Sequence, residues 1–186
     1  MIGVDEVGRG AWAGPLLVVA ARRRQTLPAP LGDSKRLSPR RREHLALLLA
    51  RCCDVGQGWV TVAELDELGL GQALRLAAGR ALAAVGALPQ ERIVIDGRVN
   101  LAPANYRNVR MIVRADQSVP IVSAAAIVAK ATRDAVMKQI ASTYPDYGFD
   151  RHVGYGTVAH QLALKRLGPV PGVHRLRFRP LAGRQP

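Results

Sequence analysis

The sequence predicts an α/β fold in one domain, residues 1–186, with about five strands and at least four helices. Short β-branched apolar runs bounded by glycines recur along the chain and are typical of buried strands. Longer segments with apolar residues at helical spacing alternate with them. A length of 186 residues and a hydrophobic content of 48% suit one core, and the 4% aromatic content indicates that Ala, Leu and Val fill it.

The first two expected strands, residues 2–7 and 16–21, flank a glycine-rich turn and predict a hairpin. The first strand contains Asp5 and Glu6, and buried carboxylates are costly unless a partner or a metal neutralises them. Because side chains alternate along a strand, both acids can share one ligand only if the strand ends or bulges there. Gly8 and Gly10 favour such a break. The alternative is an exposed turn in which the acids pair with arginines.

The middle of the chain predicts helices. Ser38 and Pro39 mark the start of a helix that should reach residue 51. Ser34 and Lys35 precede it in a loop where they could meet a phosphate, although such a tripeptide on its own is more often an ordinary turn. A weak strand over 55–60 is followed by a short helix, and then by an amphipathic helix with these core-facing residues: Leu74, Ala77, Ala78, Ala81, Leu82 and Val85.

Two further acids follow apolar strands in the second half. Asp96 ends the expected strand 92–96, a position from which α/β proteins often present catalytic groups, although Asp-Gly is also a common turn. Asp116 lies between the expected strand 109–113 and a long helix over 119–142. On that helix we expect Asp134 to pair with a neighbouring basic residue, Arg133 or Lys138. Tyr155, between two glycines, precedes a short C-terminal helix.

The formal net charge of +13 favours a polyanionic partner, with nucleic acid as the first candidate. Purely binding proteins share such a charge, so it does not indicate catalysis. Cys52 and Cys53 are adjacent and cannot join distant segments, which fits a reducing compartment. The sequence shows neither an apolar run of membrane-spanning length nor a signal peptide. We therefore expect a cytoplasmic monomer with no membrane partner.

Several motifs resemble, in order, those of the ribonuclease HII family. They read D-E-V-G-R-G-A-W-A-G-P from residue 5, D-S-K-R-L-S from residue 33, D-Q-S-V-P-I-V-S from residue 116 to T-R-D at 134, G-Y-G-T from residue 154, and the closing G-P-V-P-G-V-H-R-L-R-F-R-P. The resemblance implies a ribonuclease H-like fold with a mixed five-stranded central sheet flanked by helices, and a short tail over 176–186. Gly69 and Ala126 depart from the family pattern, which usually has Asn and Ser there. Arg9 and the lack of a separate N-terminal domain distinguish the sequence from ribonuclease HIII.

The resemblance also implies an activity. It is hydrolysis of the RNA strand of RNA/DNA hybrids and incision at single ribonucleotides in duplex DNA, leaving a 3′-hydroxyl and a 5′-phosphate. We expect Mg²⁺ or Mn²⁺ as cofactor, since clustered carboxylates without His or Cys favour these ions. The expected catalytic and metal-binding residues are Asp5, Glu6, Asp96 and Asp116. The expected substrate-binding residues are Gly8, Arg9, Gly10, Ser34, Lys35 and Tyr155.

Two other functions remain as alternatives. A non-catalytic basic nucleic-acid-binding protein would explain the charge but not the four acids. Another metal-dependent nuclease of the same architecture, such as a junction resolvase, would use the acids but ignore the 2′-hydroxyl group by which a protein distinguishes RNA from DNA.

Overall fold

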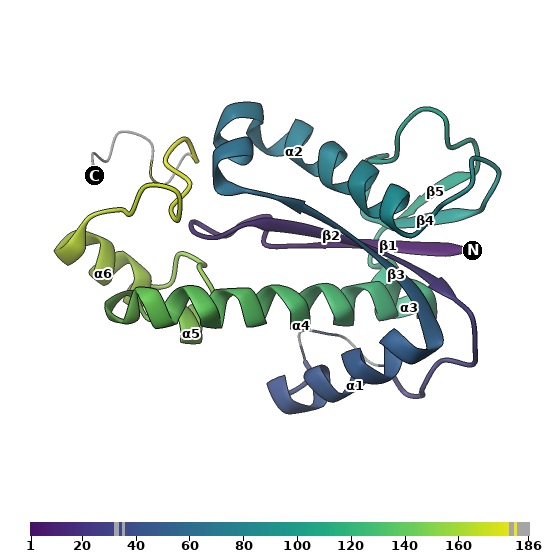
Figure 1. Cartoon of the computed structure of the whole chain (residues 1–186), viewed down its shortest axis with the longest axis horizontal. Helices are drawn as coiled ribbons and strands as arrows, with labels where there is room; N and C mark the ends of the chain where they lie inside the picture. Colours follow the sequence, from purple (N-terminus) through teal and green to yellow (C-terminus); the bar gives the residue numbers. More distant parts are fainter. Residues whose placement is uncertain (32–33, 35, 179–180, 182–186) are drawn as a thin grey trace.

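The structure is a computed structural model and describes residues 1–31, 34, 36–178 and 181. Figure 1 shows the arrangement of the elements. In chain order they are β1 (Ile2–Val7), β2 (Leu16–Arg23), α1 (Pro39–Cys52), β3 (Cys53–Val60), α2 (Val62–Ala84), β4 (Ile93–Asp96), β5 (Val109–Ile112), α3 (Ala115–Ser118), α4 (Pro120–Thr143), the 3-10 helix η1 (Pro145–Tyr147), α5 (Phe149–His152) and α6 (Val158–Leu167).

The strands form one mixed sheet in the order β3-β2-β1-β4-β5. The expected hairpin is confirmed, because β1 and β2 pair antiparallel, as do β2 and β3. The pairs β1–β4 and β4–β5 are parallel. The mixed five-stranded sheet is therefore as predicted, while the strand order is information that the sequence patterns do not contain.

Helices cover both faces of the sheet (Figure 1). On one face α2 packs against β3 and β2, and the core there also takes in residues of β1 and β4 and contains the six predicted residues of the amphipathic helix. On the other face α4 packs against β1 and β2, and α1 packs against α4 and β3. Gly3 of β1 lies so close to α4 that a Cβ would clash with the backbone of Ile121. The long central helix α4 is thus held directly against the strand that carries Asp5 and Glu6.

The helix after β3 differs from expectation. The short helix and the amphipathic helix form one element, α2, with a kink at Gly69, where φ is 72° and ψ is 161°. With this ψ the residue lies outside the left-handed helical region that asparagine tolerates, in a region that is essentially restricted to glycine. The predicted capping box is present, since the Thr61 and Glu64 side chains each accept a hydrogen bond from the other's main-chain N–H.

The C-terminal elements form a third core with the end of α4. Met137, Phe149 and Leu181 are fully buried in this core. The expected tail begins with packed residues, because the main-chain N–H groups of Leu176 and Arg177 donate to the Asp66 carboxylate. Of the tail, residues 179–180 and 182–186 lie outside the described residues. No helix in the described part of the chain is long and apolar enough to cross a membrane.

Candidate active site

The register of two parallel strands places Asp5 and Asp96 side by side. Val4 pairs with Ile95, so the next residue on each strand is an acid. Asp96 accepts a hydrogen bond of 2.7 Å from the main-chain N–H of Ala115, the first residue of α3. The sheet therefore brings together two acids that are 91 positions apart in the sequence, at the edge where α/β proteins often bind ligands.

Asp116 is fixed on α3 beside these strand ends. The residue is 7% exposed, and its carbonyl accepts a hydrogen bond from the Ser123 hydroxyl on α4. Arg114, just before α3, has a left-handed backbone with φ of 58°. Non-glycine residues rarely adopt this conformation. Asp116 thus lies on a short helix that follows a sharp backbone turn and is anchored to both β4 and α4.

The acidic pair does not lie at a strand end, contrary to expectation. β1 continues through Glu6 and Val7 in regular register with Val18 and Leu17, and the turn begins only at Gly8, where φ is 86°. Regular alternation places Asp5 on the α4 face and Glu6 on the α2 face. Glu6 accordingly lines a cavity of about 290 Å³ with residues of α2.

Electrostatics nevertheless couples the four acids. Burial raises the pKa of Asp5 well above its usual value, and the charges of Glu6, Asp96 and Asp116 raise it further. Burial also raises the pKa of Glu6, against the opposing charge of Arg9, which lies 3.6 Å away, and with a further increase from Asp96. Like charges near a buried carboxylate favour its protonated form. The predicted acids therefore occupy one electrostatic environment, which a cation would stabilise.

The donor chemistry fits a hard divalent cation, because all four groups are carboxylates and Mg²⁺ and Mn²⁺ prefer oxygen ligands. Within the described ranges, no group of three Asp, Glu, His or Cys side chains has the geometry of a metal site. This absence includes the trio Asp5, Asp96 and Asp116 as well as sets that contain Glu6. An ion bound here would therefore require movement of more than the Glu6 side chain.

The glycine turn, residues 8–15, lies against the tyrosine loop, residues 153–156. Ala11 and Tyr155 form an antiparallel bridge, and the N–H of Trp12 donates to Gly154 O at 2.8 Å. A Cβ at Gly154 would clash with the carbonyl of Ala13, so the two segments need glycine to approach this closely. The structure thus places the turn that contains Gly8, Arg9 and Gly10 against the loop that contains Tyr155.

The loop that contains Ser34 and Lys35, predicted to contact the substrate, is only partly described. Ser34 is buried, and its carbonyl accepts a hydrogen bond of 2.9 Å from Arg42 Nε. Lys35 lies outside the described residues.

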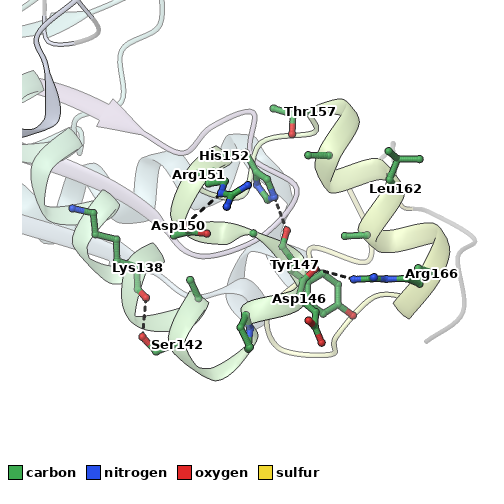
Figure 2. Close-up of a pocket in the computed structure, with 15 residues that line it drawn as sticks. Lys138, Ser142, Asp146, Tyr147, Asp150, Arg151, His152, Thr157, Leu162 and Arg166 are labelled. Carbon is green, nitrogen blue, oxygen red and sulfur yellow. Dashed lines mark hydrogen bonds and ion pairs between the residues drawn. The ribbon is translucent and has the colours of Figure 1, made fainter.

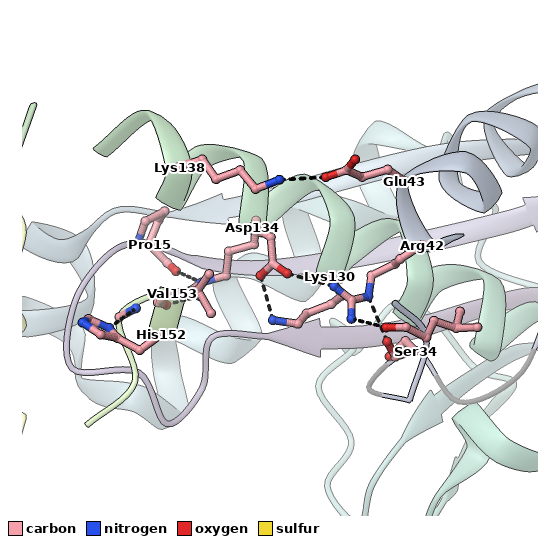
Figure 3. Close-up of polar contacts among 12 residues, drawn as sticks. Pro15, Ser34, Arg42, Glu43, Lys130, Asp134, Lys138, His152 and Val153 are labelled. Atoms are coloured by element: carbon pink, nitrogen blue, oxygen red, sulfur yellow. Dashed lines mark hydrogen bonds and ion pairs between the residues drawn. The ribbon is translucent and has the colours of Figure 1, made fainter. Parts of the chain in front are cut away.

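The prediction that Asp134 pairs with Arg133 or Lys138 is wrong. Its carboxylate binds Arg42 at 3.0 Å and Lys130 at 2.7 Å (Figure 3). Asp134 faces α1 across the helix interface and so supports the arginine that holds the Ser34 segment.

A larger cavity, about 960 Å³, lies between α4, α5 and α6 (Figure 2). Its rim carries both signs of charge, from Lys138, Arg151 and Arg166 and from Asp146 and Asp150. None of the predicted site residues lines it. Size alone therefore does not mark the candidate site in this fold.

Two buried arginines were missed by the sequence analysis. Arg133 and Arg175 are fully buried, and both donate hydrogen bonds to carbonyls of the glycine turn. A signal existed for Arg133, because it lies four residues from both Ala129 and Met137 on the buried stripe of α4. The residue pattern around Arg175 contains no comparable periodicity.

Comparisons with known proteins agree with this geometry. A family model described as Ribonuclease HII matches residues 2–180. Ribonuclease HII of Thermus thermophilus is 45% identical over 184 residues, covering 97% of this chain and 86% of that protein. The solved ribonuclease HII of Archaeoglobus fulgidus, in complex with PCNA, gives a TM-score of 0.82 at 26% identity, covering 97% of this chain and 94% of that one.

A more distant solved structure, Bst-RNase HIII in complex with Mn²⁺, gives a TM-score of 0.71 at 22% identity and covers 97% of this chain and 67% of that one. It supports the same ribonuclease H-like fold. The sequence matches over nearly the whole chain are much stronger and identify the type. The chain belongs to the ribonuclease HII family, and this membership supports ribonuclease H activity on nucleic acid.

Proposed function

We propose that the protein hydrolyses the RNA strand of RNA/DNA hybrids and incises duplex DNA at single embedded ribonucleotides, with Mg²⁺ or Mn²⁺ as cofactor. The products would be a 3′-hydroxyl and a 5′-phosphate. The observation that carries this proposal is the electrostatic coupling of Asp5 to Glu6, Asp96 and Asp116 at one end of the sheet, beside the glycine turn. A purely binding protein has no need for four acids at this position in a chain of net charge +13.

The four carboxylates would hold the metal. When bound, divalent ions activate a water for attack on a phosphodiester and stabilise the leaving oxygen. Asp5 and Asp96 present oxygen ligands from adjacent strands, and Asp116 adds one from α3. Glu6 is restrained by Arg9, whose side chain is 61% exposed and can turn to a nucleic acid phosphate, leaving Glu6 available to the site.

The ribose would be recognised by the glycine turn and the tyrosine loop together. Discrimination between RNA and DNA at one nucleotide needs a contact to the 2′-hydroxyl. Gly8 and Gly10 let main-chain polar groups approach a sugar closely, because no side chain intervenes. Tyr155 is half-buried and lies against the turn, so its ring can stack on the same sugar.

A variant of Asp116 tests the proposal. We expect Asp116→Asn to reduce Mg²⁺-dependent cleavage of a duplex with one ribonucleotide by about a hundredfold or more, because an amide lacks the charge that holds the cation. The matched control is Asp150→Asn, an exposed acid at the other cavity, which should cleave normally. Cleavage is measured on labelled duplex with and without divalent metal, and folding by circular dichroism.

The substrates separate the alternatives. The same assay includes an all-DNA duplex and a four-way junction, and we expect neither to be cut. Near-normal cleavage by Asp116→Asn would rule out the assigned site. Cleavage of the junction in preference to the ribonucleotide duplex would favour a different nuclease, and absence of both cleavage and Mn²⁺ binding would favour a binding protein.

A further inference from the structure

We propose that Arg133 is a positioning residue that fixes the glycine turn and the tyrosine loop relative to each other, so that both contact one ribose. This inference rests on the proposed function, from which it takes the ribose-contacting roles of the two segments. Arg133 itself would not touch the substrate. It lies on α4 with no exposed surface.

One guanidinium group joins the two segments by hydrogen bonds. Arg133 Nε donates to Pro15 O at 2.8 Å and Nη2 donates to Ala13 O at 3.0 Å, both in the glycine turn. Arg133 Nη1 donates to Val153 O at 2.9 Å in the tyrosine loop; the contacts around Pro15 and Val153 are drawn in Figure 3. The guanidinium plane is rigid, so these three bonds set the relative position of the segments.

The same group also touches the two predicted ribose-contacting elements directly. The guanidinium carbon of Arg133 lies 5.8 Å from the centre of the Tyr155 ring, within the range of a cation–π contact. A Cβ at Gly8 would clash with Arg133 Nε, so the turn rests on the guanidinium group at that residue. A displacement of Arg133 would therefore be transmitted to both.

The backbone before Tyr155 adds an independent reason. Val153 has φ of 43°, in the left-handed region that β-branched residues very rarely adopt. Its carbonyl accepts the Arg133 Nη1 bond, two residues before Tyr155. This bond stabilises an otherwise unfavourable conformation that directs the chain into Tyr155.

The second buried arginine differs in what it holds. Arg175 donates to Gly8 O at 2.7 Å and to Gly14 O at 2.8 Å. These bonds brace the glycine turn, whereas the bonds of Arg133 run to the turn and to the tyrosine loop. A role in coupling the two segments therefore belongs to Arg133.

The test measures a preference, which a merely structural role would leave unchanged. Binding of a duplex with one ribonucleotide and of the same all-DNA duplex is measured in Mg²⁺ with the Asp116→Asn protein, and the ratio of affinities gives the preference. We expect Arg133→Lys to reduce this ratio by about tenfold or more, because small misplacements of contacting groups are costly. The all-DNA affinity should change little, since it depends on surface charge.

Arg22→Lys is the matched control. Arg22 also donates to two main-chain carbonyls, Val85 O at 3.1 Å and Gly86 O at 2.9 Å. It lies on β2 opposite Ile2, at the end of β1 that is far from the glycine turn. We expect this variant to be destabilised with an unchanged preference. Val153→Gly, added to Arg133→Lys, should restore part of the preference, because glycine adopts a positive φ without support.

The outcomes separate the two proposals. If the Asp116→Asn reference itself shows no preference for the ribonucleotide, the proposed function fails and this inference fails with it. If the reference shows the preference and Arg133→Lys keeps it while the unfolding midpoint falls, only the positioning role is overturned. If Arg133→Lys does not fold, ¹⁵N-arginine spectra of the Asp116→Asn protein decide: the Arg133 Nε–H signal should shift more with the ribonucleotide duplex than with all-DNA duplex, and equal shifts overturn the role.

Discussion

Gly8 shows how one residue serves backbone geometry and packing together. Its φ of 86° favours glycine, and Arg133 occupies the space that a Cβ would need. A left-handed backbone costs a non-glycine residue about 1–2 kcal/mol, and the clash adds to this. We therefore expect Gly8→Ala to destabilise the protein by more than that backbone cost and to reduce cleavage of the ribonucleotide duplex.

Gly172→Ala is the matched control for this prediction. Gly172 also has a positive φ, 76°, but no atom lies within 4 Å of its Cβ position. This variant should lose only the backbone contribution and cleave normally. Both free energies of unfolding are obtained by denaturant titration, and equal losses for the two variants would show that the space at Gly8 is not restricted.

At the scale of elements, the N-terminus of α2 depends on its cap. Thr61 accepts from the N–H of Glu64, and the Glu64 carboxylate binds Arg80 at 2.6 Å, which holds the pKa of Glu64 at about 2. Loss of a threonine cap costs about 1 kcal/mol. We expect Thr61→Ala to lower the free energy of unfolding by that amount without changing cleavage.

Thr61→Ser retains the hydroxyl and should recover most of this stability. Thermal unfolding of the two variants is the measurement. If both lose the same stability, the methyl group of Thr61 and not its capping oxygen makes the contribution.

The elements also show what sequence patterns can and cannot predict. The strand containing Asp5, the helix after Ser38 and the strand ending at Asp96 follow from local signals, namely β-branched runs and caps. The alignment of Asp5 with Asp96 depends on a parallel pairing between distant segments, which no local signal specifies. The strand over 2–7 is as expected, but the break expected at Asp5 and Glu6 is absent, because the backbone turns only at Gly8.

The sequence analysis missed the buried arginines for a related reason. An arginine in an amphipathic helix normally marks the solvent face, but Arg133 lies on the buried stripe because main-chain carbonyls of two distant segments accept its N–H groups. These carbonyl partners lie next to Arg133 only in the folded protein, so no local sequence pattern indicates them. The prediction of Asp5, Glu6 and Asp96 as site residues rests on their unusual position within or at the end of apolar strands, whereas Asp116 lies on α3.

For the whole molecule, the stability at low pH depends on a group of three buried histidines in the C-terminal core. His174 Nδ1 accepts from the N–H of Val170 at 2.8 Å, and His174 and His160 share a 3.2 Å hydrogen bond between their Nε2 atoms. His152 stacks on His160 at 4.5 Å. Burial lowers the pKa of both His160 and His174 from 6.5 to about 4.

These shifts set the direction of the pH dependence. The unfolded chain binds protons on these rings below pH 6.5, whereas the folded protein resists protonation until about pH 4. The contribution of both rings is complete above pH 6.5 and declines as the pH falls toward 4. Since one unit of pKa difference is worth about 1.4 kcal/mol, we expect stability to fall by a few kcal/mol over this interval.

The measurement must remove an opposing effect. The raised pKa values of Asp5 and Glu6 make them bind protons more readily in the folded state, which increases stability as the pH falls. We therefore expect the decline in denaturant titrations of the Asp5→Asn/Glu6→Gln variant between pH 6.5 and about pH 5. A constant free energy there would mean that the rings are protonated in the folded state.

Two non-glycine residues in the described part of the chain have left-handed backbones, and they have a shared consequence for evolution. Arg114 and Val153 each lie two positions before a predicted site residue, Asp116 and Tyr155 respectively. Local strain of this kind is retained where surrounding structure enforces it. Selection for heat resistance would favour glycine or asparagine at both positions, because these residues adopt a positive φ at a lower cost. Libraries intended to stabilise the protein while keeping the path of the chain into Asp116 and Tyr155 should sample these two residues at both codons.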